Sequence, residues 1–305
     1  MKTNRNPPLR ALHYSVKGAA CACLALLITF SAQAQNFFVS SFTGVIDEYT
    51  PDGTSSIFAS GLSDPSGLAF DNGGILFEAD NISGNIFDFT SAGVKSTFAS
   101  GLSHPIGLAF NSAGDLFETD AGTGNINDFT AGGVRNTFSA GLNAPAGLAF
   151  NSAGNLFVAD QGSGNIYEFT PGGVQSTFAS GLGTPRALAF NNAGDLFVSC
   201  LSGNIYEFTP GGVRSPFATV SPSVDGLAFN NAGDLFATVQ MPGSIYQFTP
   251  GGVQSTFASD LPHPGNAPSF LAFQGESLPV PEPSALGMLA MGITAILMRR
   301  QFNCQ

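Results

Sequence analysis

Tryptophan is absent from this chain of 305 residues, and charged side chains make up only 10% of it. Basic residues are especially scarce, since ten Lys and Arg stand against 21 Asp and Glu. Six of the ten lie near the two ends, so that residues 35–281 hold four basic and twenty acidic side chains, a net charge of −16. A surface of that sign repels phosphate backbones, and the sequence contains no basic patch. We therefore expect no nucleic acid among the partners.

Cysteine is also rare, and its four positions exclude a disulfide framework. Cys21 and Cys23 lie near the N-terminus and Cys304 near the C-terminus, which leaves Cys200 alone between them. One thiol forms no internal disulfide. No His or Cys lies near Cys200 in the sequence, so we expect an inert, half-buried thiol and not a reactive one.

The first 34 residues have the pattern of a secretory signal peptide. Four basic residues precede an apolar run, Ala19 to Phe30, and Ala32-Gln33-Ala34 supplies a cleavage site of small residues. The mature chain would begin at Gln35. An uncleaved anchor is the alternative, although the apolar run is short for a membrane span.

One motif recurs along the rest of the chain. The segment Gly-Leu-Ala-Phe and its variants return at steps of 40, 40, 40, 39 and 44 residues. The copies are Gly67–Phe70, Gly107–Phe110, Gly147–Phe150, Ala187–Phe190, Gly226–Phe229 and, more loosely, Phe270–Phe273. A period near 40 indicates a repeat architecture, and one propeller blade has this length.

Each repeat contains four short apolar runs separated by turn residues. In the third copy the runs are 147–150, 156–160, 165–170 and 174–179, with Gly-rich or Pro-Gly segments between them. Such runs are too short for helices, and their Phe, Val, Ile and Thr content favours strands joined by tight turns. Four strands of this kind form one antiparallel blade.

Counting the strands predicts how the ring closes. The first Leu-Phe-Val-Ala-Asp-like segment, Phe37–Ser41, has no Gly-Leu-Ala-Phe strand before it, and the last such strand, Phe270–Phe273, has no segment after it. We therefore predict an all-β, six-bladed propeller over residues 36–275, closed by N- and C-terminal strands that share one blade.

The repeated aromatic and acidic positions are interpreted as structural. Aromatic side chains that return in every blade fill the wedge between neighbouring sheets, although sugar stacking is an alternative role. Asp80, Asp120 and Asp160 each precede a Gly-containing turn, so we expect them to accept hydrogen bonds from turn amides. Calcium binding is the alternative, but these carboxylates lie one to a blade.

The phrase Gly-Leu-Ala-Phe-Asn-x-x-Gly-x-Leu-Phe-Val-Ala-Asp resembles NHL-repeat propellers and the six-bladed group that includes gluconolactonase-like proteins. The resemblance covers residues 36–275 and implies the fold more than an activity. In lactonase-like members, metal ligands precede the glycine that opens the innermost strand. Here only Asp225-Gly226 fits, and the neighbouring blade has Arg186-Ala187. We therefore predict no metal, no cofactor and no catalytic residue.

The position before that glycine varies more than any other in the repeat. It reads Ser66, Ile106, Ala146, Arg186, Asp225 and Ser269 along the chain. We call these six residues the mouth column, because they should face one mouth of the central channel. Ser66, Arg186, Asp225 and Ser269 are candidate ligand-binding residues, with Arg186 as anchor for an acidic or hydroxylated ligand such as a saccharide. A purely structural Arg186–Asp225 pair that bridges two blades is the alternative.

The end of the chain resembles a PEP-CTERM sorting signal. Val280-Pro281-Glu282-Pro283 lies in a linker, residues 276–284, and precedes a hydrophobic helix and basic tail, residues 285–305. The resemblance implies export in a Gram-negative bacterium, processing by an exosortase and transient contact of the helix with the inner membrane. A simple membrane anchor is the alternative.

These features favour an exported, non-catalytic binding or structural module, with extracellular polysaccharide or another surface component as its expected partner. Its expected location is the cell envelope, the cell surface or the extracellular matrix. A lactonase- or lyase-like enzyme that uses the channel mouth is the second hypothesis.

Overall fold

The structure is a computed structural model that describes residues 35–259, 261 and 268–275. The predicted signal peptide, the linker and the sorting helix lie outside the described residues. Within the described ranges every regular element is a strand, and no helix there is long and apolar enough to cross a membrane.

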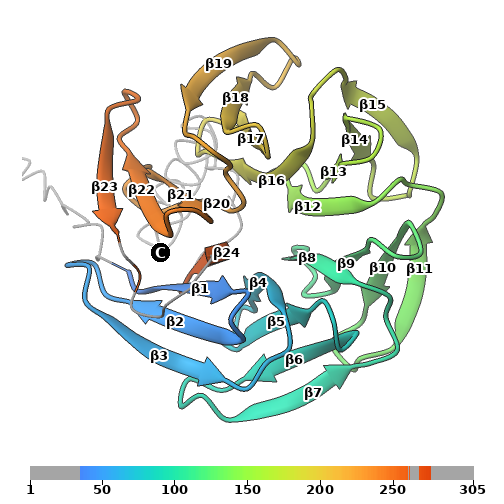
Figure 1. Ribbon diagram of the computed structural model, residues 1–305. Coiled ribbons are helices and arrows are strands. Elements are labelled where there is room, and N and C mark those ends of the chain that lie inside the picture. Colours follow the sequence, from blue (N-terminus) through green and yellow to red (C-terminus); the bar gives the residue numbers. More distant parts are fainter. Residues whose placement is uncertain (1–34, 260, 262–267, 276–305) are drawn as a thin grey trace, which may run out of the picture. The chain divides into compact units, whose positions relative to one another are not determined.

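Six antiparallel sheets of four strands each are arranged around a central axis (Figure 1). We number them as blades 1 to 6 in chain order. Blade 1 contains β24 (Pro268–Phe273), β1 (Phe37–Ser41), β2 (Val45–Tyr49) and β3 (Ser55–Ser60). Blade 2 contains β4 (Pro65–Phe70), β5 (Leu76–Asp80), β6 (Asn85–Phe89) and β7 (Lys95–Ala99). Blade 3 contains β8 (Pro105–Phe110), β9 (Leu116–Asp120), β10 (Asn125–Phe129) and β11 (Arg135–Ser139).

The second half of the ring repeats the arrangement. Blade 4 contains β12 (Pro145–Phe150), β13 (Leu156–Asp160), β14 (Asn165–Phe169) and β15 (Gln175–Ala179). Blade 5 contains β16 (Pro185–Phe190), β17 (Leu196–Cys200), β18 (Asn204–Phe208) and β19 (Arg214–Thr219). Blade 6 contains β20 (Leu227–Phe229), β21 (Leu235–Val239), β22 (Ser244–Phe248) and β23 (Gln254–Ala258). The first strand in each blade is the innermost, which confirms the predicted propeller.

The two ends of the repeat region share blade 1, as predicted. β24 pairs with β1 in antiparallel register, with Phe37 opposite Phe273 and Val39 opposite Leu271. The N–H of Gln274 also donates to the carbonyl of Asn36 at 3.0 Å. This pairing joins segments more than 230 residues apart in sequence and closes the ring.

Four of the six inner strands have a glycine, Gly67, Gly107, Gly147 or Gly226, that close packing between blades requires. A Cβ added at Gly67 would lie 2.3 Å from the carbonyl oxygen of Ile106, and one at Gly147 would lie 2.5 Å from that of Arg186. Both distances are far below contact distance, so only glycine lets the inner strands approach this closely. The main chain of four mouth-column residues, Ile106, Ala146, Arg186 and Ser269, is therefore in contact with the preceding blade.

The repeated aspartates hold turns, as predicted. Asp80 accepts hydrogen bonds from the N–H of Ser63 at 2.7 Å and of Ser83 at 3.0 Å. Asp120 does the same with Ser103 and Thr123. Each aspartate thus fixes the loop that leads into its own blade and the turn that follows its own strand.

The aromatic side chains fill the spaces between blades. Phe77 of blade 2 packs edge-on against Phe98 of the same blade and against Phe110 of blade 3, with ring centroids 5.0 and 5.1 Å apart. Equivalent trios recur around the ring, which confirms the packing role of these residues. Cys200 differs from expectation in degree, since it is 1% exposed and not half-buried.

Candidate functional site

Five of the six mouth-column residues are the second residue of an innermost strand. Each follows the proline that opens its strand, so all five lie at the same end of the channel. Asp225 is the exception, because β20 is short and begins two residues later, at Leu227. Asp225 is nevertheless held like a strand residue, since its N–H donates to the carbonyl of Thr238 at 3.0 Å.

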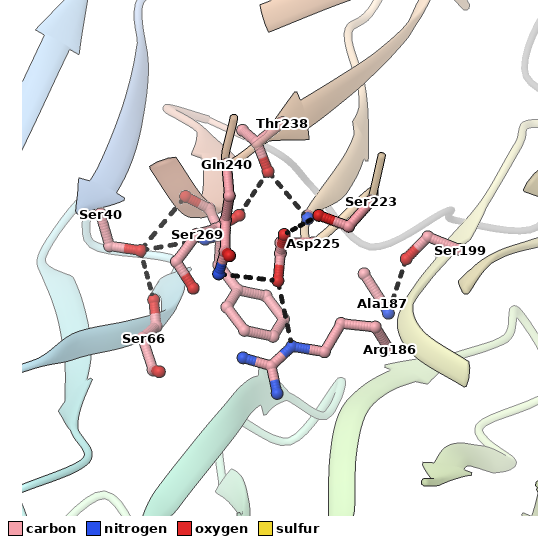
Figure 2. A network of polar contacts seen from close by, with 12 residues as sticks. Ser40, Ser66, Arg186, Ala187, Ser199, Ser223, Asp225, Thr238, Gln240 and Ser269 are labelled. Atoms are coloured by element: carbon pink, nitrogen blue, oxygen red, sulfur yellow. Dashed lines mark hydrogen bonds and ion pairs between the residues drawn. The ribbon is translucent and has the colours of Figure 1, made fainter. Parts of the chain in front are cut away.

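Arg186 and Asp225 form an ion pair between blades 5 and 6 (Figure 2). The Nε of Arg186 lies 3.7 Å from Oδ1 of Asp225, and the two side chains are 11% and 1% exposed. The guanidinium also lies over the ring of Phe270, 5.3 Å from its centroid. The distance between the two charged groups is thus near the upper limit for an ion pair. The contact with the Phe270 ring also fixes the position of the buried arginine.

Asp225 has two further polar neighbours. Gln240 donates from Nε2 to Oδ1 at 3.3 Å, and Ser223 donates from Oγ to Oδ2 at 3.4 Å. Both hydrogen bonds are long. Burial raises the pKa of the Asp225 carboxyl to about 6, and the Arg186 guanidinium and Ser223 offset part of that rise.

The charge of a second carboxylate, that of Asp64, also acts on the Arg186 guanidinium. Burial lowers the pKa of Arg186, while the charges of Asp225 and Asp64 act in the opposite direction. The pKa of Asp64 is itself raised by burial and by the neighbouring charge of Asp80. The mouth thus brings one cation and two carboxylates under mutual influence in a partly desolvated setting.

Hydroxyl groups on the second strands connect the mouth column to the blades beside it. They belong to Ser40, Thr119 and Thr238, whereas Ser199 accepts a hydrogen bond from the N–H of Ala187 in its own blade. Thr238 accepts a hydrogen bond from the N–H of Gly226 at 2.8 Å and donates to the carbonyl of Ser269 in the next blade. Ser40 likewise accepts from the N–H of Phe270 at 3.0 Å and donates to the carbonyl of Ser66 at 2.6 Å. Each of these two hydroxyls therefore links the inner strand of its own blade to the inner strand of the next.

The two predicted serines behave differently from each other and from Arg186. Ser66 takes part in the blade contact through its carbonyl, and its side chain is 1% exposed. Ser269 is fully buried, and within the described part of the chain its Oγ has no hydrogen-bond partner. The structure brings Arg186 and Asp225 into direct contact, with Ser269 on blade 1, next to blade 6, and Ser66 one blade further on, in blade 2 (Figure 2).

A central cavity of about 250 Å³ begins just beyond the mouth column. Its lining starts at Gly67, Gly107, Gly147, Ala187 and Phe270 and continues along the inner strands to the Phe residues at their far ends. The mouth-column side chains themselves are not among the lining residues. Ala187 and Phe270, the residues that follow Arg186 and Ser269 in the chain, do line it.

Sequence reasoning missed two buried glutamates in neighbouring blades. Glu78 and Glu118 are fully buried on β5 and β9, where other copies of the repeat have Val158 and Val198. Asn127 donates to Glu118 at 2.8 Å, yet burial raises the pKa of Glu118 to about 8. Burial, followed by the charge of Asp80, also raises the pKa of Glu78 well above its usual value. The sequence did contain a signal for these buried glutamates, because the equivalent position is apolar in the other four blades.

Sequence reasoning also missed three residues near the mouth column, namely Gln161, Gln240 and Phe270. Phe270 directly follows the mouth-column residue Ser269. Gln161 and Gln240 occupy the position directly after β13 and β21, and the equivalent residue in blade 3 is Ala121. In the described ranges, no group of three His, Cys, Asp or Glu side chains gathers closely enough to hold a metal ion. His104 lies exposed in a bend just before β8, with a φ of 63°.

Comparison with known proteins identifies one sequence family. Residues 279–301 match the family described as the PEP-CTERM protein-sorting motif, which includes the predicted Val280, Pro281, Glu282 and Pro283. Such motifs are processed by exosortase during export to the cell envelope or surface. No curated protein matches the chain by sequence.

Solved structures share the fold at low sequence identity. A chain of a nidogen/laminin complex is 20% identical with a TM-score of 0.71, and the match covers 79% of this chain and 98% of that one. A gluconolactonase from Xanthomonas campestris is 16% identical with a TM-score of 0.63, over 78% and 88% of the two chains. A virginiamycin B lyase from Staphylococcus aureus is 17% identical with a TM-score of 0.58, over 69% and 77%.

Identities this low establish the architecture and leave activity open, because propellers of one shape carry different functions. The chain is thus a six-bladed β-propeller, built like gluconolactonase-type propellers, that carries a PEP-CTERM protein-sorting motif at residues 279–301.

Proposed function

We propose that this protein is an exported, non-catalytic β-propeller that acts as a binding or structural module. It works at the cell surface or in the extracellular polymer matrix of a Gram-negative bacterium, where its PEP-CTERM motif delivers it. The sorting motif at residues 279–301 is the observation that carries the proposal, because it gives the propeller a destination.

The use of polar groups at the channel mouth supports a non-catalytic role. Thr238 and Ser40 engage main-chain groups of the adjoining blades, and Asp225 is turned toward Arg186, Ser223 and Gln240. A general base or a metal ligand must instead present its lone pairs to a substrate or an ion. The arrangement suits a rigid binding surface better than a reaction centre.

A lactonase- or lyase-like activity is the second candidate. Asp225-Gly226 is the one pair in the mouth column that fits the lactonase pattern, and solved gluconolactonase and lyase structures share the fold. Metal analysis of the purified protein together with a lactone-hydrolysis screen tests it. Copurified divalent metal, with turnover that Asp225→Ala abolishes, would replace the binding proposal with an enzymatic one.

Cell fractionation tests the location directly. The full chain should be found in the surface or matrix fraction, and a chain that lacks residues 280–305 should not be retained there. A Pro281→Ala, Pro283→Ala double variant keeps the hydrophobic helix and separates motif recognition from simple anchoring. Unchanged retention of both altered chains would contradict the proposed route.

A further inference from the structure

The central cavity opens to solvent at the end opposite the mouth column. All six innermost strands line it, and Asn72, Asn192 and Asn231 lie two residues beyond the far ends of β4, β16 and β20. These three asparagines are both exposed and part of the cavity lining. A small molecule can therefore enter the cavity at this end, which we call the amide rim after the three side chains.

The side chains of the amide rim are not needed by the turns that carry them. In each of these turns the preceding residue, for example Asn191, accepts the N–H groups of the turn through its own side chain. The side chains of Asn72, Asn192 and Asn231 form no hydrogen bond with another described residue. Blades 3 and 4 have Ser112 and Ser152 at the same position. The asparagines are thus free to bind a ligand and are specific to blades 2, 5 and 6.

The closure of the ring fixes the position of one of these turns. The N–H of Asn231 donates to Oε1 of Gln35 at 3.1 Å, and Nε2 of Gln35 donates to the carbonyl of Gln274 at 2.8 Å. Gln35 thereby joins the turn of blade 6 to the end of β24 in blade 1. The amide rim is therefore held in place where the two ends of the propeller meet.

The wall of the cavity excludes a charged ligand. Every described residue that lines it is Gly, Ala, Leu, Phe or Asn, although the repeat region as a whole is strongly acidic. An ion that entered would lose its water and meet no opposite charge, which is unfavourable. The occupant should therefore be neutral.

The free edges of the innermost strands exclude a pure hydrocarbon. Within the described residues each innermost strand has a neighbouring strand on one side only. Main-chain N–H and C=O groups on the other edge face the cavity and need hydrogen-bond partners. A hydrocarbon would displace water from these groups and leave them unpaired. The occupant should therefore carry groups that both donate and accept hydrogen bonds.

Phenylalanine rings add apolar surface next to the amide rim. They belong to the last residue of five innermost strands, and each ring is partly exposed and lines the cavity. One side of each ring packs against a phenylalanine of the preceding blade, which holds it in a fixed orientation. These residues are Phe70, Phe110, Phe150, Phe190 and Phe229. A fitting ligand thus combines polar groups with apolar C–H surface.

We infer that the central cavity binds a single neutral hexose ring through the amide rim. Sugar hydroxyls both donate and accept, as do the amides of Asn72, Asn192 and Asn231 and the free strand edges. The C–H groups of the sugar ring contact the phenylalanine rings. The cavity of about 250 Å³ is close to the lower end of ordinary ligand pockets, roughly 300–1,000 Å³, so it has room for one ring. The inference rests on the proposed binding role and names its ligand chemistry.

Calorimetric titration of the full chain with D-glucose, D-galactose and D-mannose at millimolar concentration tests the inference. At least one of the three should bind. The hexuronate of the same configuration, which adds a negative charge, should bind at least tenfold more weakly, and so should cyclohexanol, which has one hydroxyl. Absence of binding by all three hexoses would overturn the inference. Equal binding of the hexuronate or of cyclohexanol would overturn the neutral, polyhydroxyl class of ligand.

A triple variant assigns the binding to the amide rim. Asn72→Ser, Asn192→Ser and Asn231→Ser together should weaken hexose binding at least tenfold. The melting temperature should not change, because blades 3 and 4 already have serine at this position. Asn136→Ser is the matched control, since Asn136 is exposed on the outer strand β11 and does not line the cavity, and it should bind like the wild type. Unchanged binding in the triple variant would overturn the role of the amide rim.

The test separates this inference from the proposed function. Fractionation reads the location of the protein independently of any ligand, so a protein that reaches the surface and binds no hexose would overturn the inference alone. A protein that binds hexose but is not retained at the surface would instead contradict the proposed location.

Discussion

Single buried carboxylates should make the stability of this protein fall as pH rises. Glu118 has a folded-state pKa of about 8, against 4.5 for the free side chain. An acid whose folded pKa is raised binds its proton more tightly in the folded state. Stability is therefore highest below pH 4.5 for this group and is lost between pH 4.5 and pH 8.

Replacing Glu118 by Gln removes this loss. Gln keeps a polar partner for Asn127 and has no charge to bury, so at pH 8 we expect a gain of roughly 2–4 kcal/mol in unfolding free energy. At pH 4.5 the gain should be near zero. Urea unfolding at the two pH values measures the change in unfolding free energy. The control is Glu207→Gln, a substitution at a half-buried glutamate. Equal gains at both pH values would contradict this account.

At the scale of the strand, the opening glycine is the clearest link from sequence to packing. The recurrence of Gly in the repeat was evident from the sequence, but its reason was not. The carbonyl of the next blade lies where a Cβ would be, and that carbonyl belongs to a mouth-column residue. Packing between blades thus fixes the main chain of the candidate site.

Gly147→Ala should therefore destabilise the fold. The added Cβ would lie 2.5 Å from the Arg186 carbonyl oxygen and 2.9 Å from Cα of Ala187, both on the backbone of blade 5. Overpacking of this kind costs roughly 1–3 kcal/mol. Thermal unfolding measures it, and Gly183→Ala is a matched control because nothing lies within 4 Å of its added Cβ. Similar melting temperatures for the two variants would show that the blades adjust freely.

At the scale of the whole molecule, the shared blade determines whether the ring stays closed. Deleting Ser269–Gln274 removes nearly all of β24 and leaves β1 without its inner partner. The melting temperature should fall sharply, since Phe273, Leu271 and Phe37 share one core cluster. A chain truncated after residue 275 is the control and should melt close to the full chain. An unchanged melt for the deletion would contradict closure by this strand.

The order of strands, the number of blades and the closing strand were all predictable from the sequence. These features depend on short-range signals, namely the alternation of apolar runs with Gly- and Pro-containing turns at a period near 40 residues. The structural roles of Asp80 and Phe77 could also be predicted, because the aspartate recurs in three blades and the phenylalanine in all six, as residues that the blade itself needs should.

Only the tertiary structure determined which atoms remain unsatisfied. Arg186, Asp225 and Ser269 are far apart in sequence, and the sequence placed them in one column without stating that the guanidinium uses Nε alone. It also did not predict that Glu78 and Glu118 would be fully buried. The physical reason is that local patterns set strands and turns, whereas burial and hydrogen-bond partners depend on how the neighbouring blades pack once the ring has closed.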